Sequence, residues 1–134
     1  MENLLDNDII GSIGTQKYFV KIEWRNGIFI MDEPKQIEGQ DLGPDPYTTL
    51  LAALAGCTLS TLRMYINRKG WDIPSFKVSL NMYQEQNPVR TIIKRNIIFS
   101  NKIEDTIKQR LLVIAGKCPV SKILENSITI DTKI

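Results

Sequence analysis

The feature that most constrains this 134-residue sequence is a long apolar segment near its middle. Residues 50–62 are apolar or small on every side of a helix, a pattern typical of a buried helix. Asp45 and Pro46 suit the start of that helix, and Gly70 suits the left-handed position that follows its end. The sequence therefore predicts a helix over residues 46–69. Such a helix in so short a chain needs covering material, which a sheet and a second subunit would supply.

Alternation of apolar and polar residues predicts strands on both sides of this helix. The Asn26-Gly27 pair predicts a type I′ hairpin turn between two of them. The strands are expected over residues 15–24, 28–31, 76–82, 90–99 and 128–132, and two further helices over residues 102–117, capped by Asn101, and 119–124. Helices segregated from a largely antiparallel sheet indicate an α+β fold. We expect residues 1–14 to be a flexible leader and residues 15–134 to be a single domain.

Composition and charge narrow the class of protein. The apolar fraction of 43% and the charged fraction of 24% are ordinary for a soluble globular protein. Seventeen basic and fifteen acidic residues give a net charge of +2, too balanced for a nucleic-acid footprint. We interpret the basic residues Arg90, Lys94 and Arg95 as the polar face of a strand. An acidic N-terminus and an apolar run shorter than a membrane span predict a cytoplasmic protein with no membrane or nucleic-acid partner.

The sequence contains no histidine and only two cysteines, Cys57 and Cys118. The absence of histidine excludes Ser-His and Cys-His catalytic pairs and removes the commonest zinc ligand. Two thiols alone cannot build a four-ligand structural zinc site. We therefore expect neither a metal nor another cofactor, and we expect any unusual chemistry to involve sulfur or carboxylates.

The two cysteines occupy different positions in the predicted helices. Cys57 lies three turns into the long helix, where an ordinary interpretation is a small buried apolar residue. Arg63 is about 120° away around that helix and is a poor partner for its sulfur. Cys118 precedes Pro119 at the start of the short helix, where free amides favour a thiolate. If the two thiols meet, they could form the sulfenic acid and then the disulfide of a peroxide-reducing cycle.

Two segments of the chain are distinctive: residues 43–57 read GPDPYTTLLAALAGC, and residues 115–124 read AGKCPVSKIL. Together they resemble the two cysteine motifs of the OsmC/Ohr family, and the order of predicted elements agrees over residues 15–134. The resemblance implies an OsmC-like α+β fold with a mostly antiparallel sheet around a long buried central helix. It also implies an intertwined homodimer with active sites between the subunits.

The same resemblance implies a thiol peroxidase that reduces organic hydroperoxides. Cys57 stands where the family has its peroxide-attacking cysteine, and Cys118 stands where it has the resolving cysteine. An external dithiol, lipoyl-linked in some relatives, would regenerate the thiols. The apolar helix around Cys57 favours organic hydroperoxides over hydrogen peroxide, because an apolar pocket gains from burying alkyl groups.

Two departures from the family pattern motivate a second hypothesis. The active branches have a glutamate where this chain has Tyr47, and they use an arginine from the N-terminal strands or the following loop to hold the thiolate. The first arginine here is Arg25, and neither it nor Lys35 falls in a matching motif. The alternative is therefore a non-enzymatic, dimeric OsmC-like protein with a binding or stress-response role. The sequence leaves open the substrate, the reductant and the group that activates Cys57.

Overall fold

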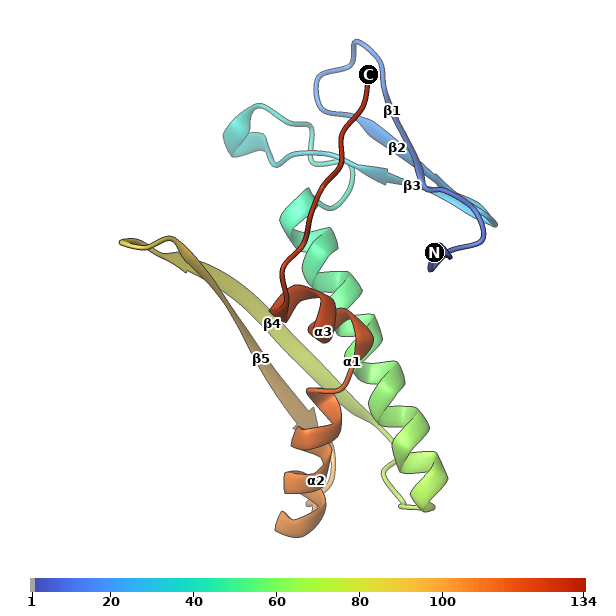
Figure 1. Cartoon of the computed structure of the whole chain (residues 1–134), viewed down its shortest axis with the longest axis vertical. Helices are drawn as coiled ribbons and strands as arrows, with labels where there is room; N and C mark the ends of the chain where they lie inside the picture. Colours follow the sequence, from blue (N-terminus) through green and yellow to red (C-terminus); the bar gives the residue numbers. More distant parts are fainter. Residues whose placement is uncertain (1) are drawn as a thin grey trace. The chain divides into compact units, whose positions relative to one another are not determined.

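The computed structural model describes residues 2–134, and its helices and antiparallel strands make an α+β fold, as the sequence predicted (Figure 1). These residues divide into two compact units, one ending at Leu50 and the other spanning Leu51–Ile134.

The first unit contains a three-stranded antiparallel sheet in the order β1-β2-β3. Its strands are β1 (Ile10–Ile13), β2 (Val20–Trp24) and β3 (Gly27–Met31), and a 3-10 turn, η1 (Lys35–Ile37), follows. β1 lies within the segment that was expected to be a flexible leader. Four of its residues pair with β2, from Ile10 opposite Glu23 to Ile13 opposite Val20, and this pairing orders the segment.

The predicted type I′ turn at Asn26-Gly27 is wrong by one residue. Gly27 pairs with Trp24 in the β2–β3 ladder, so the two turn residues are Arg25 and Asn26. None of these turn positions has a positive φ, which a type I′ turn requires. Gly27 serves a different purpose, because a β-carbon there would lie 3.2–3.3 Å from the Trp24 ring. Glycine therefore suits position 27 because it leaves room for the Trp24 indole, and not because the backbone there is left-handed.

A buried carboxylate closes the loop between β3 and the long helix. Asp32 is 2% exposed, and its oxygens accept hydrogen bonds from the backbone N–H groups of Glu33 at 2.8 Å and Leu42 at 3.2 Å. The backbone of Gly43 lies so close to the carbonyl of Ile30 that a β-carbon on Gly43 would collide with it. These contacts fix the path of the chain just before the helix begins.

The long helix α1 spans Pro46–Lys69, which confirms the predicted bounds. The Asp45 carboxylate accepts a hydrogen bond from the Thr48 hydroxyl at its start, and Gly70 takes the left-handed conformation, with φ of 68°, just beyond its end. Within this single chain the helix buries only one stripe, at every fourth residue: Leu54, Thr58, Leu62 and Ile66. The burial on every side that the sequence predicted is therefore not seen in one chain. By length and composition alone α1 passes as a membrane span, and it passes equally as the core helix of a soluble protein.

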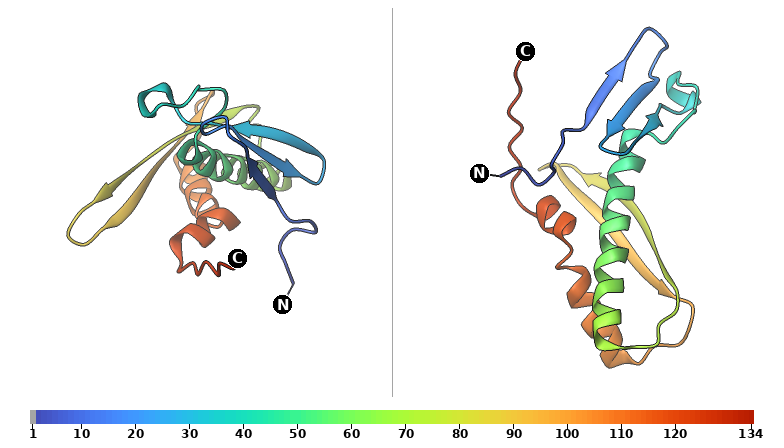
Figure 2. Two further views of the ribbon diagram at one scale, coloured as in Figure 1. Left: turned by 90° about the horizontal axis from the view of Figure 1, so that it is seen from above. Right: turned by 90° about the vertical axis from the view of Figure 1, so that its right-hand side faces the viewer.

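In the second unit, the part of α1 after Leu50 packs with a hairpin and two shorter helices (Figures 1 and 2). The hairpin joins β4 (Phe76–Glu85) to β5 (Arg90–Phe99) in antiparallel register, and the helices are α2 (Asp105–Ala115) and α3 (Pro119–Glu125). α2 begins three residues later than predicted, with Glu104 rather than Asn101 at its N-cap. The helix begins later because Ile103, which precedes it, packs into the core in a non-helical segment. The core contains Leu62, Ile66, Ile73, Ile103, Leu111, Ile114 and Ala115.

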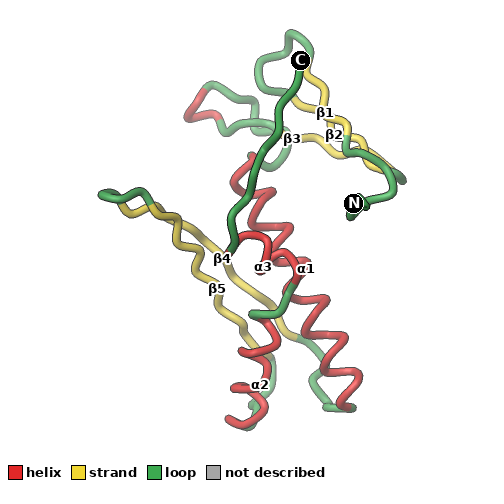
Figure 3. Tube along the Cα trace, viewed as in Figure 1, coloured by secondary structure: helices red, strands yellow, loops and turns green. Residues whose placement is uncertain are grey.

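The C-terminal residues 127–134 form no strand, although the sequence predicted one over residues 128–132 (Figure 3). A strand needs a neighbouring backbone to bond, and no sheet edge among residues 2–134 pairs with this segment. Its alternating apolar side chains are consequently exposed, Ile128 by 58% and Ile130 by 84%. The alternation that predicted a strand is present, but no strand among residues 2–134 pairs with this segment.

Candidate thiol site

The second unit brings Cys57 and Cys118 together from α1 and from the start of α3. Both cysteines are free thiols, and they lie close enough for each to shift the pKa of the other. Cys57 is partly exposed, whereas Cys118 is completely buried. The two thiols that the sequence singled out are therefore neighbours in space, 61 residues apart in the chain. Their catalytic roles stay predictions.

The first turn of α3 explains why the sulfurs converge there. A helix leaves its first N–H groups without intrahelical partners. Cys118 is the N-cap and Pro119, at the first helical position, has no N–H. The next N–H, that of Val120, donates to the Cys57 sulfur at 3.5 Å. The sulfur on α1 thus supplies an acceptor that the short helix would otherwise lack.

The environment shifts the two thiol pKa values in opposite directions. Burial and the hydrogen bond with Cys118 raise the pKa of the Cys57 thiol, against the opposing effects of the Val120 N–H and of Thr61. Burial also acts to raise the pKa of Cys118, but hydrogen bonds from Cys57, from the side chain and backbone of Ser121 and from Thr58 lower it to about 7. Of the two thiols, Cys118 is therefore the one that ionises more readily.

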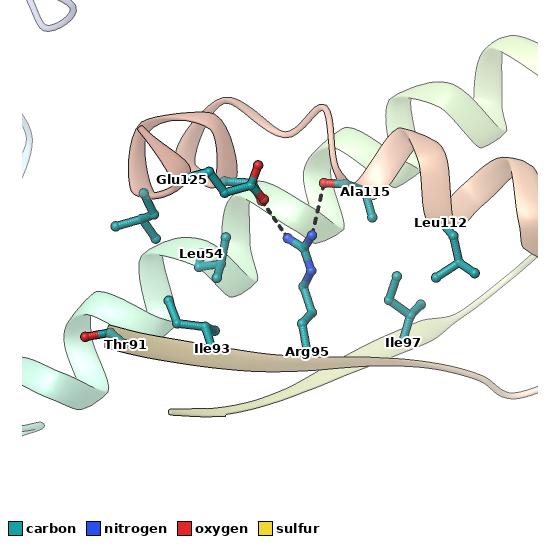
Figure 4. Close-up of a pocket in the computed structure, with 10 residues that line it drawn as sticks. Leu54, Thr91, Ile93, Arg95, Ile97, Leu112, Ala115 and Glu125 are labelled. Carbon is teal, nitrogen blue, oxygen red and sulfur yellow. Dashed lines mark hydrogen bonds between the residues drawn. The ribbon is translucent and has the colours of Figure 1, made fainter. Parts of the chain in front are cut away.

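Arg95 on β5 is a residue of this site that the sequence analysis missed. Its Nη1 donates to the Ser121 hydroxyl at 2.7 Å and to the Thr58 hydroxyl at 2.9 Å, and its Nη2 donates to the Ala115 carbonyl at 3.3 Å. Figure 4 shows the guanidinium reaching from β5 toward the end of α2. Thr58 and Ser121 are the two hydroxyl side chains that lie against Cys118, so Arg95 links the strand to the thiol site.

The interpretation of Arg90, Lys94 and Arg95 as one polar face is wrong. Side chains alternate across a strand, so Arg95 shares a face with Ile93 and Ile97, while Arg90 and Lys94 lie on the other. The period of two that identified the strand could have shown this, because it places one charge in an otherwise apolar row. These three basic residues therefore do not form one charged row on the strand.

A cavity of about 500 Å³ lies between β5 and the helices, with Arg95 in its wall (Figure 4). Its lining combines apolar side chains with a few polar ones: Leu54, Thr91, Ile93, Arg95, Ile97, Leu112, Ala115, Ser121, Leu124 and Glu125. Neither cysteine is among the residues that line this cavity.

The other charged and polar residues considered from the sequence make different contacts within their own units. Arg63 donates to the carbonyls of Ile73 and Pro74, each at 3.0 Å, and so fixes the turn after α1. Arg25 stacks on the ring of Trp24, with 5.6 Å between its guanidinium carbon and the ring centre. Tyr47 is 74% exposed. Among residues 2–134, Arg95 is the arginine that reaches the hydroxyls beside Cys118.

Comparison with known proteins identifies the family. A family model described as OsmC-like protein matches residues 39–133, which is most of the chain and includes both cysteine segments. The chain belongs to the OsmC-like family. No curated protein matches the chain at a significant level.

Solved structures share this OsmC-like fold over nearly the whole chain. A Psychrobacter arcticus protein, provisionally described as an osmotic stress induced and detoxification response protein, has 18% identity and a TM-score of 0.75, covering 92% of this chain and 91% of that one. An OsmC-like protein from Mycoplasma pneumoniae has 21% identity and a TM-score of 0.69, covering 90% and 89%. An organic hydroperoxide resistance protein from Elizabethkingia anophelis has 20% identity and a TM-score of 0.67, covering 92% and 90%. At these identities the likeness shows the fold alone.

Proposed function

We propose that this OsmC-like protein is a thiol peroxidase that reduces organic hydroperoxides through Cys57 and Cys118. The observation that carries the proposal is that two free thiols, distant in sequence, lie beside each other in a chain without histidine. Family membership supports it, since one protein of similar fold is named for organic hydroperoxide resistance. Cys57 is the attacking sulfur, because it is the partly exposed member of the pair.

The neighbouring thiols suit both steps of such a cycle. Cys57 passes its proton to the Cys118 thiolate and attacks the outer oxygen of the hydroperoxide, so the O–O bond breaks and Cys57 becomes a sulfenic acid. The departing alkoxide takes the proton from Cys118 and leaves as an alcohol. The regenerated Cys118 thiolate then attacks the sulfenic sulfur, forming the disulfide and releasing hydroxide, which is neutralised by the proton that Cys118 gave to the buffer when it ionised. An external dithiol reduces the disulfide and is itself oxidised.

The exposed surface around Cys57 favours an apolar substrate. Met64 lies seven residues further along α1, hence on the same face, and is 65% exposed. An alkyl group gains by covering such a surface, at about 25 cal/mol per Å² of apolar area. We therefore favour organic hydroperoxides over hydrogen peroxide. We also place the protein in the cytoplasm, where thiols are kept reduced.

We propose that the protein is a homodimer, in which a second copy supplies contacts that a single chain lacks. α1 buries a single stripe in one chain, and large apolar side chains such as Leu50 (41%) and Met64 stay exposed. The C-terminal segment has the alternation of a strand but no partner strand. A second copy could cover the helix and pair with this segment. Sedimentation equilibrium tests this, because a full-length monomer at micromolar concentration would contradict it.

The peroxidase proposal is tested by consumption of cumene hydroperoxide in the presence of a dithiol reductant. The wild-type protein should turn over, and its intact mass after a single oxidant pulse should fall by the two hydrogens of a disulfide. Cys57→Ser should abolish consumption. Cys118→Ser, which lacks the proton acceptor and the resolving thiol, should consume the first equivalent more slowly, accumulate sulfenic acid at Cys57 and use further equivalents only as that group is over-oxidised to sulfinic acid. Equal rates for wild type and Cys57→Ser would refute the proposal.

One observation favours the alternative of a non-enzymatic binding or stress-response protein. Burial and the hydrogen bond with Cys118 raise the pKa of Cys57, whereas a peroxide-attacking thiol is usually activated by a lowered one. The pH dependence of Cys57 alkylation separates the two functions. A reactive Cys57 at neutral pH that becomes slow in Cys118→Ser supports proton transfer within the pair. A slow Cys57 in both proteins supports the binding function.

A further inference from the structure

Arg95 is an unusual residue for its position in the hairpin. Its side chain lies on the face of β5 that carries Ile93 and Ile97, and it stands opposite Leu80 of β4. A charged group among apolar side chains is costly unless it is paired. Among residues 2–134, no carboxylate lies within ion-pair distance of its guanidinium, and its hydrogen-bond acceptors are neutral. The positive charge therefore has no acidic side chain to neutralise it.

The hydrogen bonds around Arg95 determine where each hydroxyl proton points. Nη1 donates to both Thr58 and Ser121, so each hydroxyl oxygen already accepts a bond from the cation. The Thr58 proton is directed to the Leu54 carbonyl at 2.7 Å, while the Thr58 oxygen lies 4.0 Å from the Cys118 sulfur. Ser121 is 4% exposed and is the hydroxyl that remains free to donate to Cys118.

We propose that Arg95 is a positioning residue for the thiol pair, which holds the Ser121 hydroxyl as a donor to Cys118 and so keeps that sulfur ionised. Arg95 acts through Ser121, because a hydroxyl that accepts a bond from a cation becomes a stronger donor. The lowered pKa of Cys118 agrees with this arrangement, since Ser121 is among its causes.

The other charged or titratable groups near Cys118 are few. α1 contributes the Cys57 thiol, and β5 contributes Arg95. On the segment of Cys118 itself, Lys117 and Lys122 are exposed, and the exposed Glu125 lines the same cavity as Arg95. The end of α2 supplies only the Ala115 carbonyl, which Arg95 binds. Arg95 is therefore the partly buried cation whose removal tests the proposal.

The inference deepens the proposed function, on which its kinetic part rests. In the resolving step, the Cys118 thiolate attacks the Cys57 sulfenic sulfur. The S–S bond forms, the S–O bond breaks, and the departing hydroxide is neutralised by the proton that Cys118 gave to the buffer when it ionised. The oxidant is the hydroperoxide consumed in the preceding step. Only the ionised form of Cys118 is the nucleophile, so the rate of this step follows the fraction of Cys118 that is ionised.

The first experiment measures that ionisation without any peroxide. In a Cys57→Ser background, which leaves one thiol and keeps a hydroxyl donor beside it, the ultraviolet absorbance of the Cys118 thiolate is titrated against pH. Adding Arg95→Gln should shift the titration from near 7 toward the ordinary value of 9.0. Arg95→Lys, which keeps the charge, should restore part of the shift. Lys94→Gln, a neighbouring cation on the opposite face, should leave the curve unchanged.

A second variant, Ser121→Ala, tests the same proposal if Arg95→Gln fails to fold. It removes the donor but leaves the cation, and it should raise the same midpoint. If Arg95→Gln and Ser121→Ala, each folded by circular dichroism, both titrate like Lys94→Gln, the proposal is overturned.

The second experiment follows disulfide formation in the protein with Cys57 intact. After one pulse of hydroperoxide at pH 7, Arg95→Gln should form the disulfide about fivefold more slowly for a one-unit rise in the pKa of Cys118. It should also accumulate more sulfinic acid at Cys57, while the initial loss of peroxide changes less. A shifted titration with no peroxide reduction by the wild type would refute the proposed function and leave the role of Arg95 in ionisation standing.

Discussion

Ionisation of Cys118 should couple the stability of the protein to pH. Its pKa is lowered to about 7 in the folded chain, against 9.0 for the unconstrained thiol. The folded state therefore loses this proton near pH 7, while the unfolded state keeps it until near pH 9. The unfolded state binds more protons between these values, so the free energy of unfolding should rise from pH 7 to pH 9. As pH falls through 7, this contribution is lost.

The size of the effect follows from the two-unit difference. At 1.36 kcal/mol per unit, the full contribution would be about 2.7 kcal/mol. The side chain of Cys118 is buried, but its neighbours Lys117 and Pro119 are exposed, so solvent screens part of the interaction. We expect a rise of roughly 1–2 kcal/mol after that discount. The raised pKa of Cys57 opposes this as pH approaches 9, because the unfolded thiol is half ionised at 9.0 while the folded one still holds its proton.

Urea unfolding at several pH values from 6 to 9 measures this contribution. Protein concentration must be fixed and a reductant present, because both dimerisation and disulfide formation change apparent stability. Wild type should gain stability over this range relative to Cys118→Ser, which has no thiol to titrate at that position. Cys57→Ser, which keeps a donor beside Cys118, should retain most of the gain. Parallel curves for wild type and Cys118→Ser would refute the reasoning.

Two further predictions concern the framework that positions the site. Gly43→Ala should destabilise the protein by about 1–3 kcal/mol in urea unfolding, because its β-carbon would collide with the Ile30 carbonyl. Gly14→Ala, whose β-carbon would meet nothing within 4 Å, is the control, and an equal loss there would contradict this explanation. Leu62→Ala, at a fully buried position of α1, should cost about 2–5 kcal/mol. Thermal unfolding measures it, and a loss below 1 kcal/mol would show that the core described here is not the one that stabilises α1.

Local signals in the sequence predicted the parts of the fold that depend on few residues. Pro46 and Gly70 mark the ends of α1 because proline suits the first helical position and glycine tolerates the positive φ beyond the last. The break between α2 and α3 was predictable from the Cys118-Pro119 pair for the same kind of local reason. Both cysteines of the candidate site were identified from their helix positions and motifs.

The predictions from sequence were wrong where the role of a residue depends on a contact with a neighbour outside its local pattern. Gly27 matched the local rule for a hairpin turn, but it accommodates the Trp24 ring instead. The alternation over residues 128–132 is that of a strand, yet a strand also requires a partner, which the described chain does not provide. In both cases the local sequence pattern was identified correctly, but the structure formed there depends on tertiary contacts that the pattern does not contain.

Arg95 illustrates what a strand pattern can and cannot reveal. Its alternation with Ile93 and Ile97 is enough to show that a cation faces the interior. A cation in that position indicates a polar group opposite, because burial without a partner is costly. The identity of the group requires the packing of α1 and α3 against the hairpin, which brings Thr58 and Ser121 to one guanidinium. An inward-facing charge can therefore be read from the sequence as a sign of a site, while the chemistry it serves comes only from the fold.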